Sequence, residues 1–408
     1  METVSDAIIV GSGPCGLFTA LNLAKQDITV TVFEEHDEIG IPCHCTGHLS
    51  IKGLRNLGLY PLPKDVIENI FFGANFYSPS GKKFSVRFSK PVTCVINRAL
   101  FDKHIAEMAE KAGAQYCLNS RVNSLIIEND FVKGVSVKRN GEIDDKFMAK
   151  IVVDAEGISS RILRRAGLQP PNSNMFVNAV QAEVENVKDV EPDMVEVFLG
   201  KDYAPDLYAW LTPKHDGKAK VGLAAQKGNP KEFLQRLMCK HPAASKKLHT
   251  ARILRTAFHP ITLGGPVPKT YSNGFLAVGD VASQVKPTTG GGVILGMNCA
   301  KIAAEVAGEA LHANDLSSNF LSKYQRRCEK ILGFDMKAML RVRRMLNKLS
   351  DKKVDGVISF CTKLGLDKTL QNVKDIDFQG KALVHALRSP RTFSALLYLF
   401  FLHLSANP

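Results

Sequence analysis

The sequence predicts an α/β protein built on a doubly wound parallel sheet, with an inserted antiparallel sheet and a helical C-terminal region. Three observations lead to this fold class: a glycine-rich turn between a buried strand and a helix near residue 11, a Gly-Asp and triple-glycine segment near residue 280, and alternating apolar residues between them. The 408 residues, 45% of them hydrophobic and 23% charged, are enough for two or three packed domains.

The first glycine-rich turn follows a predicted strand at residues 6–10 and begins a helix at residues 14–25, with the sequence Gly11-Ser-Gly-Pro-Cys-Gly16. Gly11 allows the tight turn, Gly13 lets the backbone approach a pyrophosphate, and Gly16 lets the helix pack close to the strand. The amides at the helix start then face the phosphates. The alternative is an ordinary glycine-rich turn.

The next predicted strand, at residues 28–33, ends at Glu34, about 20 residues past the glycines. A carboxylate at this place accepts hydrogen bonds from ribose hydroxyls and disfavours a 2'-phosphate. The strand, the turn, the helix and the acidic strand end agree with one another. Together they predict an adenine dinucleotide site.

The second cofactor-type segment begins with a short strand that ends in Gly279-Asp280, where a carboxylate can hold a polyol hydroxyl. The run Gly290-Gly291-Gly292-Val293 then opens a helix through residue 304, whose amides can face a second phosphate or a flavin edge. Two such helix starts, one toward each end of the sequence, indicate one long cofactor stretched between them. FAD fits that span.

Three further segments complete the predicted cofactor domain. Residues 151–157 form another strand and turn of the same sheet, and Arg98 begins a helix at residues 99–112 after a strand at residues 93–96. Val122, after a strand at residues 115–118, brings backbone groups near the adenine. Alternation over residues 178–259 predicts the inserted sheet, which roofs the flavin and forms a substrate cavity. The predicted domains are residues 1–177 and 266–318 for FAD binding, residues 178–265 for the substrate, and residues 319–408 for the helical region.

The charge and cysteine content limit the partners and the compartment. A net charge of +13 indicates an anionic partner, and with no nucleic-acid module this is a membrane surface or a phosphorylated substrate. A merely well-solvated basic surface remains the alternative. Nine cysteines at irregular spacing are typical of a reducing cytoplasmic setting, not of a disulfide framework.

The most apolar stretch, residues 393–404, is shorter than the ~20 residues of a spanning helix. With the basic residues before it, this stretch suits an interfacial anchor on an anionic membrane. Equally, it suits a terminal helix packed in the core.

The run Cys43-His-Cys45-Thr-Gly-His48 places four possible metal ligands within six residues. Neighbouring side chains point apart and no second Cys/His pair stands at finger spacing, so we predict no metal site. A Cys43–Cys45 disulfide is strained and is not expected either. The interpretation left is a loop that passes the flavin ring with Cys45 on the substrate side, either as a catalytic group or as a small packing residue.

With these residues in place, the chain resembles the geranylgeranyl reductase family of FAD enzymes, particularly archaeal members that saturate membrane-lipid precursors. The resemblance covers most of residues 4–330. It rests on the first glycine turn with Glu34, on residues 40–50, on Asn97-Arg98-Ala-Leu-Phe-Asp102, on Tyr208-Ala-Trp210-Leu-Thr-Pro213-Lys214, and on residues 278–292. The Tyr-x-Trp-x-x-Pro-Lys element is the most family-specific.

The resemblance implies a set of residues around FAD and two residues, Tyr208 and Trp210, that line a prenyl cavity. The residues implied around FAD are Cys15, Glu34, Cys45, Thr46, His48, Arg98, Val122, Asp280, Gly291, Gly292 and Val293, in addition to Gly11, Gly13, Gly16 and Gly279 from the glycine patterns. Two departures stand out: Glu156-Gly157 replaces the usual Asp-Gly, and Thr46-Gly47 replaces the Gly-Glu that follows Cys45 in many members. Any catalytic role of that glutamate therefore has no matching residue at this position of the chain.

The expected reaction is saturation of an isoprenoid double bond, with hydride from reduced FAD and a proton added to the other carbon. A dry cavity with aromatic faces then protects cationic character in the alkene. The expected partners are a prenyl lipid or prenyl diphosphate, an anionic membrane surface, and an external electron donor such as NAD(P)H, a reduced deazaflavin or ferredoxin. We expect a cytoplasmic protein bound peripherally to the membrane. The alternatives are an FAD-dependent monooxygenase of an apolar substrate and a non-catalytic prenyl carrier on the same skeleton.

Overall fold

The first sheet of the molecule has eight strands and carries both glycine-rich turns. This computed structural model describes residues 4–139, 145–371, 373 and 375–404. The strand order is β17 (Tyr271–Ser272), β18 (Phe275–Ala277), β11 (Asp145–Asp154), β1 (Val4–Val10), β2 (Val30–Phe33) and β8 (Gln115–Cys117), with β10 (Phe131–Arg139) and β9 (Ser120–Glu128) continuing from β11. β1 pairs in parallel with both β2 and β11.

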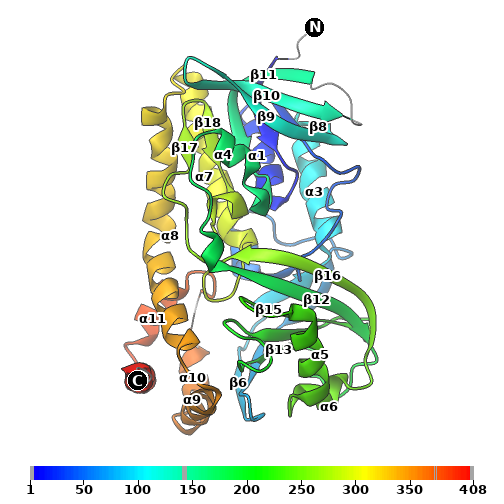
Figure 1. Cartoon of the computed structure of the whole chain (residues 1–408), viewed down its shortest axis with the longest axis vertical. Helices are drawn as coiled ribbons and strands as arrows, with labels where there is room; N and C mark the ends of the chain where they lie inside the picture. Colours follow the sequence, from blue (N-terminus) through cyan, green and yellow to red (C-terminus); the bar gives the residue numbers. More distant parts are fainter. Residues whose placement is uncertain (1–3, 140–144, 372, 374, 405–408) are drawn as a thin grey trace.

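The two faces of this sheet are covered differently. Three long helices lie side by side on one face (Figure 1): α1 (Pro14–Ala24), α3 (Arg98–Lys111) and α7 (Val293–His312). Strand alternation sends Ala7 and Ile9 toward these helices and Ile8 and Val10 to the other face. There, the β9–β10 hairpin and the short α4 (Arg161–Arg165) provide the packing. The α/β class is therefore confirmed, but this described face lacks the long helices of an ideal doubly wound sheet.

The second sheet has seven strands and lies at the other end of the molecule (Figure 1). Its order is β16 (Arg252–Thr262), β12 (Phe176–Glu185), β15 (Ala219–Ala225), β14 (Ala209–Pro213), β13 (Met194–Phe198), β5 (Gly73–Tyr77) and β6 (Lys83–Arg87). Helices α5 (Pro230–Lys240) and α6 (Ala244–Leu248) pack on one face. The inserted sheet is thus wider than residues 178–265, and it is mixed because β13 and β5 run parallel.

A small third sheet and a long helix connect the two parts. β3 (His48–Ser50), β7 (Thr93–Ile96) and β4 (Ile67–Phe71) form the small sheet beside α2 (Ile51–Asn56). The helix α8 (Ser318–Asn347) has 30 residues, about 45 Å, and runs along the length of the molecule (Figure 1).

The helical C-terminal region expected from the sequence is confirmed. After α8 it contains α9 (Asp351–Lys363), α10 (Leu366–Leu370), α11 (Gln379–Ala386) and α12 (Pro390–Leu404). Of the helices that the structure describes, none is long and apolar enough to cross a bilayer.

Candidate active site

The first glycine turn holds the start of α1 open to a ligand. Gly11 has a φ of +95°, and a Cβ there would lie 2.7 Å from the carbonyl oxygen of Ala155. A Cβ on Gly16 would lie 2.0 Å from the Gly11 oxygen, so only glycine lets α1 pack this closely on the turn. Gly13 is the N-cap of α1, with no side-chain cap and open space around it. The first amides of α1 can therefore receive a phosphate.

Glu34 lies at the end of β2, beside this turn, and its carboxylate is already hydrogen-bonded. The backbone N–H and the hydroxyl of Ser12 donate to Oε2 at 2.8 and 2.7 Å, and the His36 N–H donates to Oε1 at 3.1 Å. The His36 ring nitrogen Nδ1 lies 2.5 Å from Oε1. Burial acts to raise the pKa of Glu34, but the bonds from Ser12 and His36 outweigh it and lower the pKa below its usual value. Glu34 is therefore a charged acceptor that could hold a ribose hydroxyl, beside the half-exposed ring of His36.

The second glycine segment meets the first one in space, although it lies far along the chain. The turn at Gly279 is so close to α1 that a Cβ there would lie 2.9 Å from Cys15 Sγ, and a Cβ on Gly296 of α7 would lie 2.5 Å from the same sulfur. Cys15 is therefore the contact between the two segments. Its thiol is buried, which raises its pKa well above the usual value.

The start of α7 resembles that of α1 in having a glycine N-cap, but it is more closely packed. Gly292 is its N-cap and lacks a side-chain cap. A Cβ at Gly292 would lie 2.8 Å from Oδ1 of Asp280, so the carboxylate at the end of the preceding strand reaches the helix start. Gly291 and Val293 flank this point, and the Gly291 oxygen accepts a bond from the Lys286 N–H at 3.2 Å. The two uncapped helix starts can bind phosphates, and the two strand-end carboxylates can bind hydroxyl groups, so this set of groups fits an FAD molecule.

Arg98 and Cys45 line a shared cavity of about 320 Å3. Arg98, the first residue of α3, makes a bidentate pair with Asp102, with Nε–Oδ1 and Nη2–Oδ2 distances of 3.1 and 2.8 Å. Burial raises the pKa of Asp280, and the Arg98 charge opposes this change. Arg98 thus places a positive charge between the cavity and the second carboxylate.

The loop that carries Cys45 is fixed by bonds on both sides. The Gly47 N–H lies 3.4 Å from Cys45 Sγ, and the Thr46 hydroxyl donates to the side-chain oxygen of Gln181 on the large sheet. His48 Nε2 lies 2.7 Å from the hydroxyl of Thr93. His48 is exposed to solvent, but the protein atoms packed around its ring desolvate it and lower its pKa to about 4.

Cys43 lines the same cavity as Cys45, and burial raises the pKa of its thiol. All nine cysteines are free. Within the described ranges, no group of three or more His, Cys, Asp and Glu side chains is gathered as a metal site.

A largely buried ion network that no sequence pattern had indicated also lines this cavity. Lys220 Nζ lies 2.5 Å from Glu68 Oε2 and donates to the Thr46 carbonyl oxygen at 2.9 Å. Lys214 Nζ bridges Glu68 and Glu183 at 3.0 and 2.6 Å. Lys214 is the last residue of the Tyr-x-Trp-x-x-Pro-Lys element, and this element was the sequence signal that could have indicated the network. The network connects the Cys45 loop to the large sheet. Its positive and negative side chains neutralise one another beside that loop.

Tyr208 and Trp210 lie together at the start of β14. The rings are 5.9 Å apart at 66°, and the Tyr208 hydroxyl donates to the Thr289 carbonyl oxygen at 2.9 Å, in the loop before α7. Burial raises the pKa of Tyr208 to about 12. The Trp210 indole covers Gly222, where a Cβ would lie 2.5 Å from Cζ2. An aromatic wall therefore reaches from the large sheet to the second glycine segment.

Two sequence expectations concerned Val122, near the adenine, and Glu156, where the family usually has aspartate. Val122 is buried in β9, where it pairs with Val137, and the nearby Ser120 N–H donates to the Glu34 carbonyl oxygen at 2.7 Å. The departure at Glu156 has a local explanation: Oε1 accepts the N–H of Ile162 at 2.6 Å, at the start of α4. The longer side chain is therefore engaged by the protein itself.

Comparisons with known proteins agree with this geometry. Residues 4–332 match the family model described as FAD binding domain. Digeranylgeranylglycerophospholipid reductase of Methanocaldococcus jannaschii is 33% identical over 88% of this chain and 90% of its own, and that of Methanosarcina acetivorans is 30% identical over 95% and 93%. A geranylgeranyl bacteriochlorophyll reductase-like protein from Thermoplasma acidophilum superposes with a TM-score of 0.86 at 28% identity, over 97% of this chain and 99% of its own.

A flavin-dependent brominase superposes with a TM-score of 0.69 at 19% identity over 86% of this chain and 93% of its own, which shows the shared fold alone. The predictions of FAD as cofactor and of an oxidoreductase are confirmed by the family match and the reductase relatives. The chain therefore belongs to the digeranylgeranylglycerophospholipid reductase family of FAD enzymes.

Proposed function

We propose that this protein saturates the isoprenoid double bonds of a digeranylgeranyl glycerophospholipid or a closely related prenyl compound. The observation that carries the proposal is the aromatic wall of Tyr208 and Trp210, since the Tyr208 hydroxyl contacts the loop before α7, which is one of the two uncapped helix starts. A long apolar substrate needs such a wall, and the membrane-lipid reductases among its relatives use substrates of this class by name.

The residues of the chain have distinct tasks in this proposal. FAD, when bound, supplies hydride after an external donor has reduced it. Tyr208 and Trp210 hold the prenyl chain and stabilise positive charge that develops on the alkene carbon, since aromatic faces attract cations. Tyr208 keeps its proton at neutral pH as an ordinary tyrosine does, and burial raises its pKa further, to about 12. We assign a catalytic role to Cys45, which lines the cavity of about 320 Å3 together with Arg98.

The test is an anaerobic assay of purified FAD-loaded protein with digeranylgeranyl glycerophospholipid, geranylgeranyl diphosphate and a prenylated quinone. Dithionite, NAD(P)H, a reduced deazaflavin and ferredoxin are compared as electron donors. Mass spectrometry should show a gain of two hydrogens for each double bond reduced. Incorporation of oxygen with matching oxygen uptake in air would identify a monooxygenase instead, and purified protein without flavin absorbance would identify a carrier.

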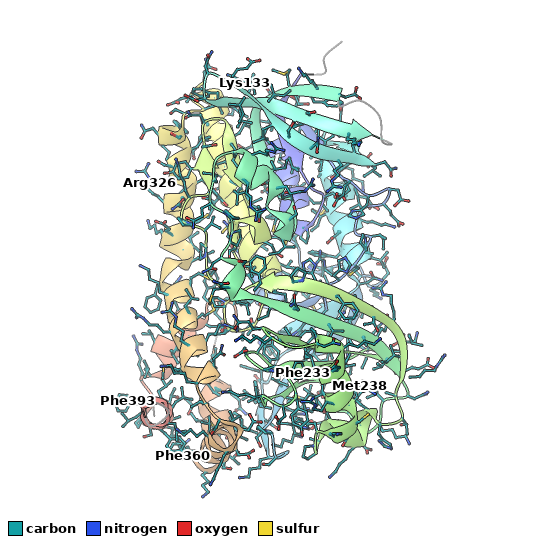
Figure 2. The ribbon with its side chains drawn as sticks, in the orientation of Figure 1. Lys133, Phe233, Met238, Arg326, Phe360 and Phe393 are labelled. Carbon is teal, nitrogen blue, oxygen red and sulfur yellow. The ribbon has the colours of Figure 1, made fainter. Side chains whose placement is uncertain are left out.

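We also propose peripheral association with the cytoplasmic face of an anionic membrane, through the helix α12. One side of α12 packs on α9, with the Tyr398 and Phe360 rings 4.4 Å apart, and the other exposes Phe393 and Leu397 by 55% and 44%. Figure 2 shows Phe360 and Phe393 at the same end of the molecule. The helix thus combines a packed side with an apolar exposed side, as interfacial helices do.

Liposome flotation tests this proposal without removing the packed side. The double variant Phe393→Gln and Leu397→Gln should bind anionic liposomes more weakly than the parent. The control is Ile253→Gln, at an apolar residue of β16 that is 49% exposed. High salt should release part of the parent, because screening weakens only the charged contribution. Equal flotation of both variants would place the membrane contact elsewhere.

A further inference from the structure

A second cavity, of about 400 Å3, lies between α8 and the large sheet and is lined by several basic side chains. Its lining contains three basic side chains, two amides and two apolar residues, and no acidic residue. The lining residues are Met175, Gln226, Leu340, Arg343, Arg344, Asn347 and Lys348. A cavity with this composition suits a ligand that joins an anionic group to a hydrocarbon.

The central residue of this cavity is Arg343, which is buried although it is charged. It is 5% exposed, and its one hydrogen bond in the described part of the chain runs from Nη1 to the Pro287 carbonyl oxygen at 3.3 Å. No ion pair of Arg343 occurs among the described residues. Burial lowers the pKa of Arg343, and the negative charge of Asp206 acts in the opposite direction but does not outweigh burial. A buried guanidinium with five N–H donors normally lies in contact with an anion.

Both polar and apolar residues surround Arg343 in this cavity. Arg344 is exposed at the next position of α8, and Gln226 lies across the cavity at the end of β15. Leu340, on the same helix, is packed beside Gly265, and Met175 is packed beside Gly264, so each side of the cavity also contributes an apolar residue. Arginine at such a place binds phosphate through paired N–H donors.

The cavity is connected to the aromatic wall through a single loop. Arg343 contacts the carbonyl oxygen of Pro287, and Tyr208 contacts that of Thr289, two residues further. The loop ends at the start of α7, beside the second glycine segment. A phosphate in this cavity would therefore lie near the loop that Tyr208 contacts.

We propose that Arg343 and Arg344 bind the phosphate group of the prenyl substrate and so fix how far its tail extends toward the flavin. The identity of the ligand rests on the proposed function. The shared chemistry is a phosphate monoester or diester, and we commit to the phosphate of the substrate and not to free phosphate.

Calorimetric titration of FAD-loaded protein tests the inference, with geranylgeranyl phosphate, geranylgeraniol and inorganic phosphate as probes. Arg344→Gln should bind geranylgeranyl phosphate about tenfold more weakly, equivalent to about 1.4 kcal/mol, and geranylgeraniol as the parent does. Arg343→Gln should show the larger loss. Arg341→Gln, at an exposed residue of the same helix outside the cavity lining, should change neither affinity.

The outcomes separate this inference from the proposed function. Equal losses for phosphate and alcohol, or no loss in Arg344→Gln, overturn the phosphate site even if the protein reduces prenyl lipids. Inorganic phosphate that binds the parent as tightly as geranylgeranyl phosphate also overturns it. A parent that reduces no alkene but shows the Arg344 discrimination keeps the site and refutes the reductase proposal. Arg344 is exposed, so its variant remains decisive if Arg343→Gln does not fold.

Discussion

The carboxylate of Glu34 gives the sharpest test of the FAD site, through the substitution Glu34→Gln. The change preserves shape and removes the charge. A hydrogen bond to a charged group contributes about 1.5–3 kcal/mol. Because the carboxylate already contacts the His36 ring, we expect the lower end, about 1.5 kcal/mol, or roughly tenfold in the Kd of FAD.

Flavin fluorescence titration of apoprotein measures this Kd directly. Glu35→Gln is the matched control, since Glu35 is 47% exposed and lies 3.4 Å from Arg121 at the surface. A second readout is pH: the lowered pKa keeps Glu34 charged, so its contribution stays constant from pH 7 to pH 5 and is lost only as the pH falls through the lowered value. Unchanged affinity in Glu34→Gln, or an equal loss in Glu35→Gln, would refute the assignment.

Three further outcomes are expected. Cys45→Ala should keep FAD and lose much of the reductase rate, whereas Cys43→Ala should keep both; equal rates in all three proteins would reduce Cys45 to a packing residue. Gly222→Ala places a Cβ 2.5 Å from the single tryptophan and should cost about 1–3 kcal/mol of stability, shift its fluorescence emission and raise the KM; an unshifted emission would contradict the packing described here. The buried His241 has its pKa lowered to about 4 by burial, and its Nδ1 accepts two backbone N–H groups. As the pH falls, the unfolded chain therefore protonates His241 at a higher pH than the folded protein does, and the free energy of unfolding should fall by about 2 kcal/mol between pH 6.5 and pH 5. Thermal melts should show a smaller fall in His241→Asn. The exposed His249→Asn should show the same fall as the parent.

The parts of the site that sequence reasoning found are those with local geometric demands. Gly11 and Gly16 are required by close backbone contacts within one strand, turn and helix, so a short motif contains the whole constraint. The partners of Glu68 lie more than 100 residues away, and Arg343 meets Pro287 only because α8 folds back along the molecule. No periodicity within a segment encodes such contacts, since they depend on how distant elements pack.

The same holds for the strands at residues 73–87. As a sequence they are two short amphipathic runs, and only the pairing of β5 with β13 assigns them to the large sheet. Residues 178–265 alone consequently do not contain the complete sheet, although their alternating pattern is clear.

This interleaving has a consequence for protein engineering. A cassette of residues 178–265, moved into another flavoprotein to change its substrate range, would leave behind β5 and β6 and expose the edge of β13 to pairing with other chains. A chimaera with crossover points before Gly73 and after Thr262 would carry all seven strands together, but it would also exchange β7, α3 and the first-sheet strands β8, β9, β10 and β11. Only the longer exchange therefore keeps the large sheet complete, and its flavin site then depends on how well the new β11 pairs with the retained β1 and β18.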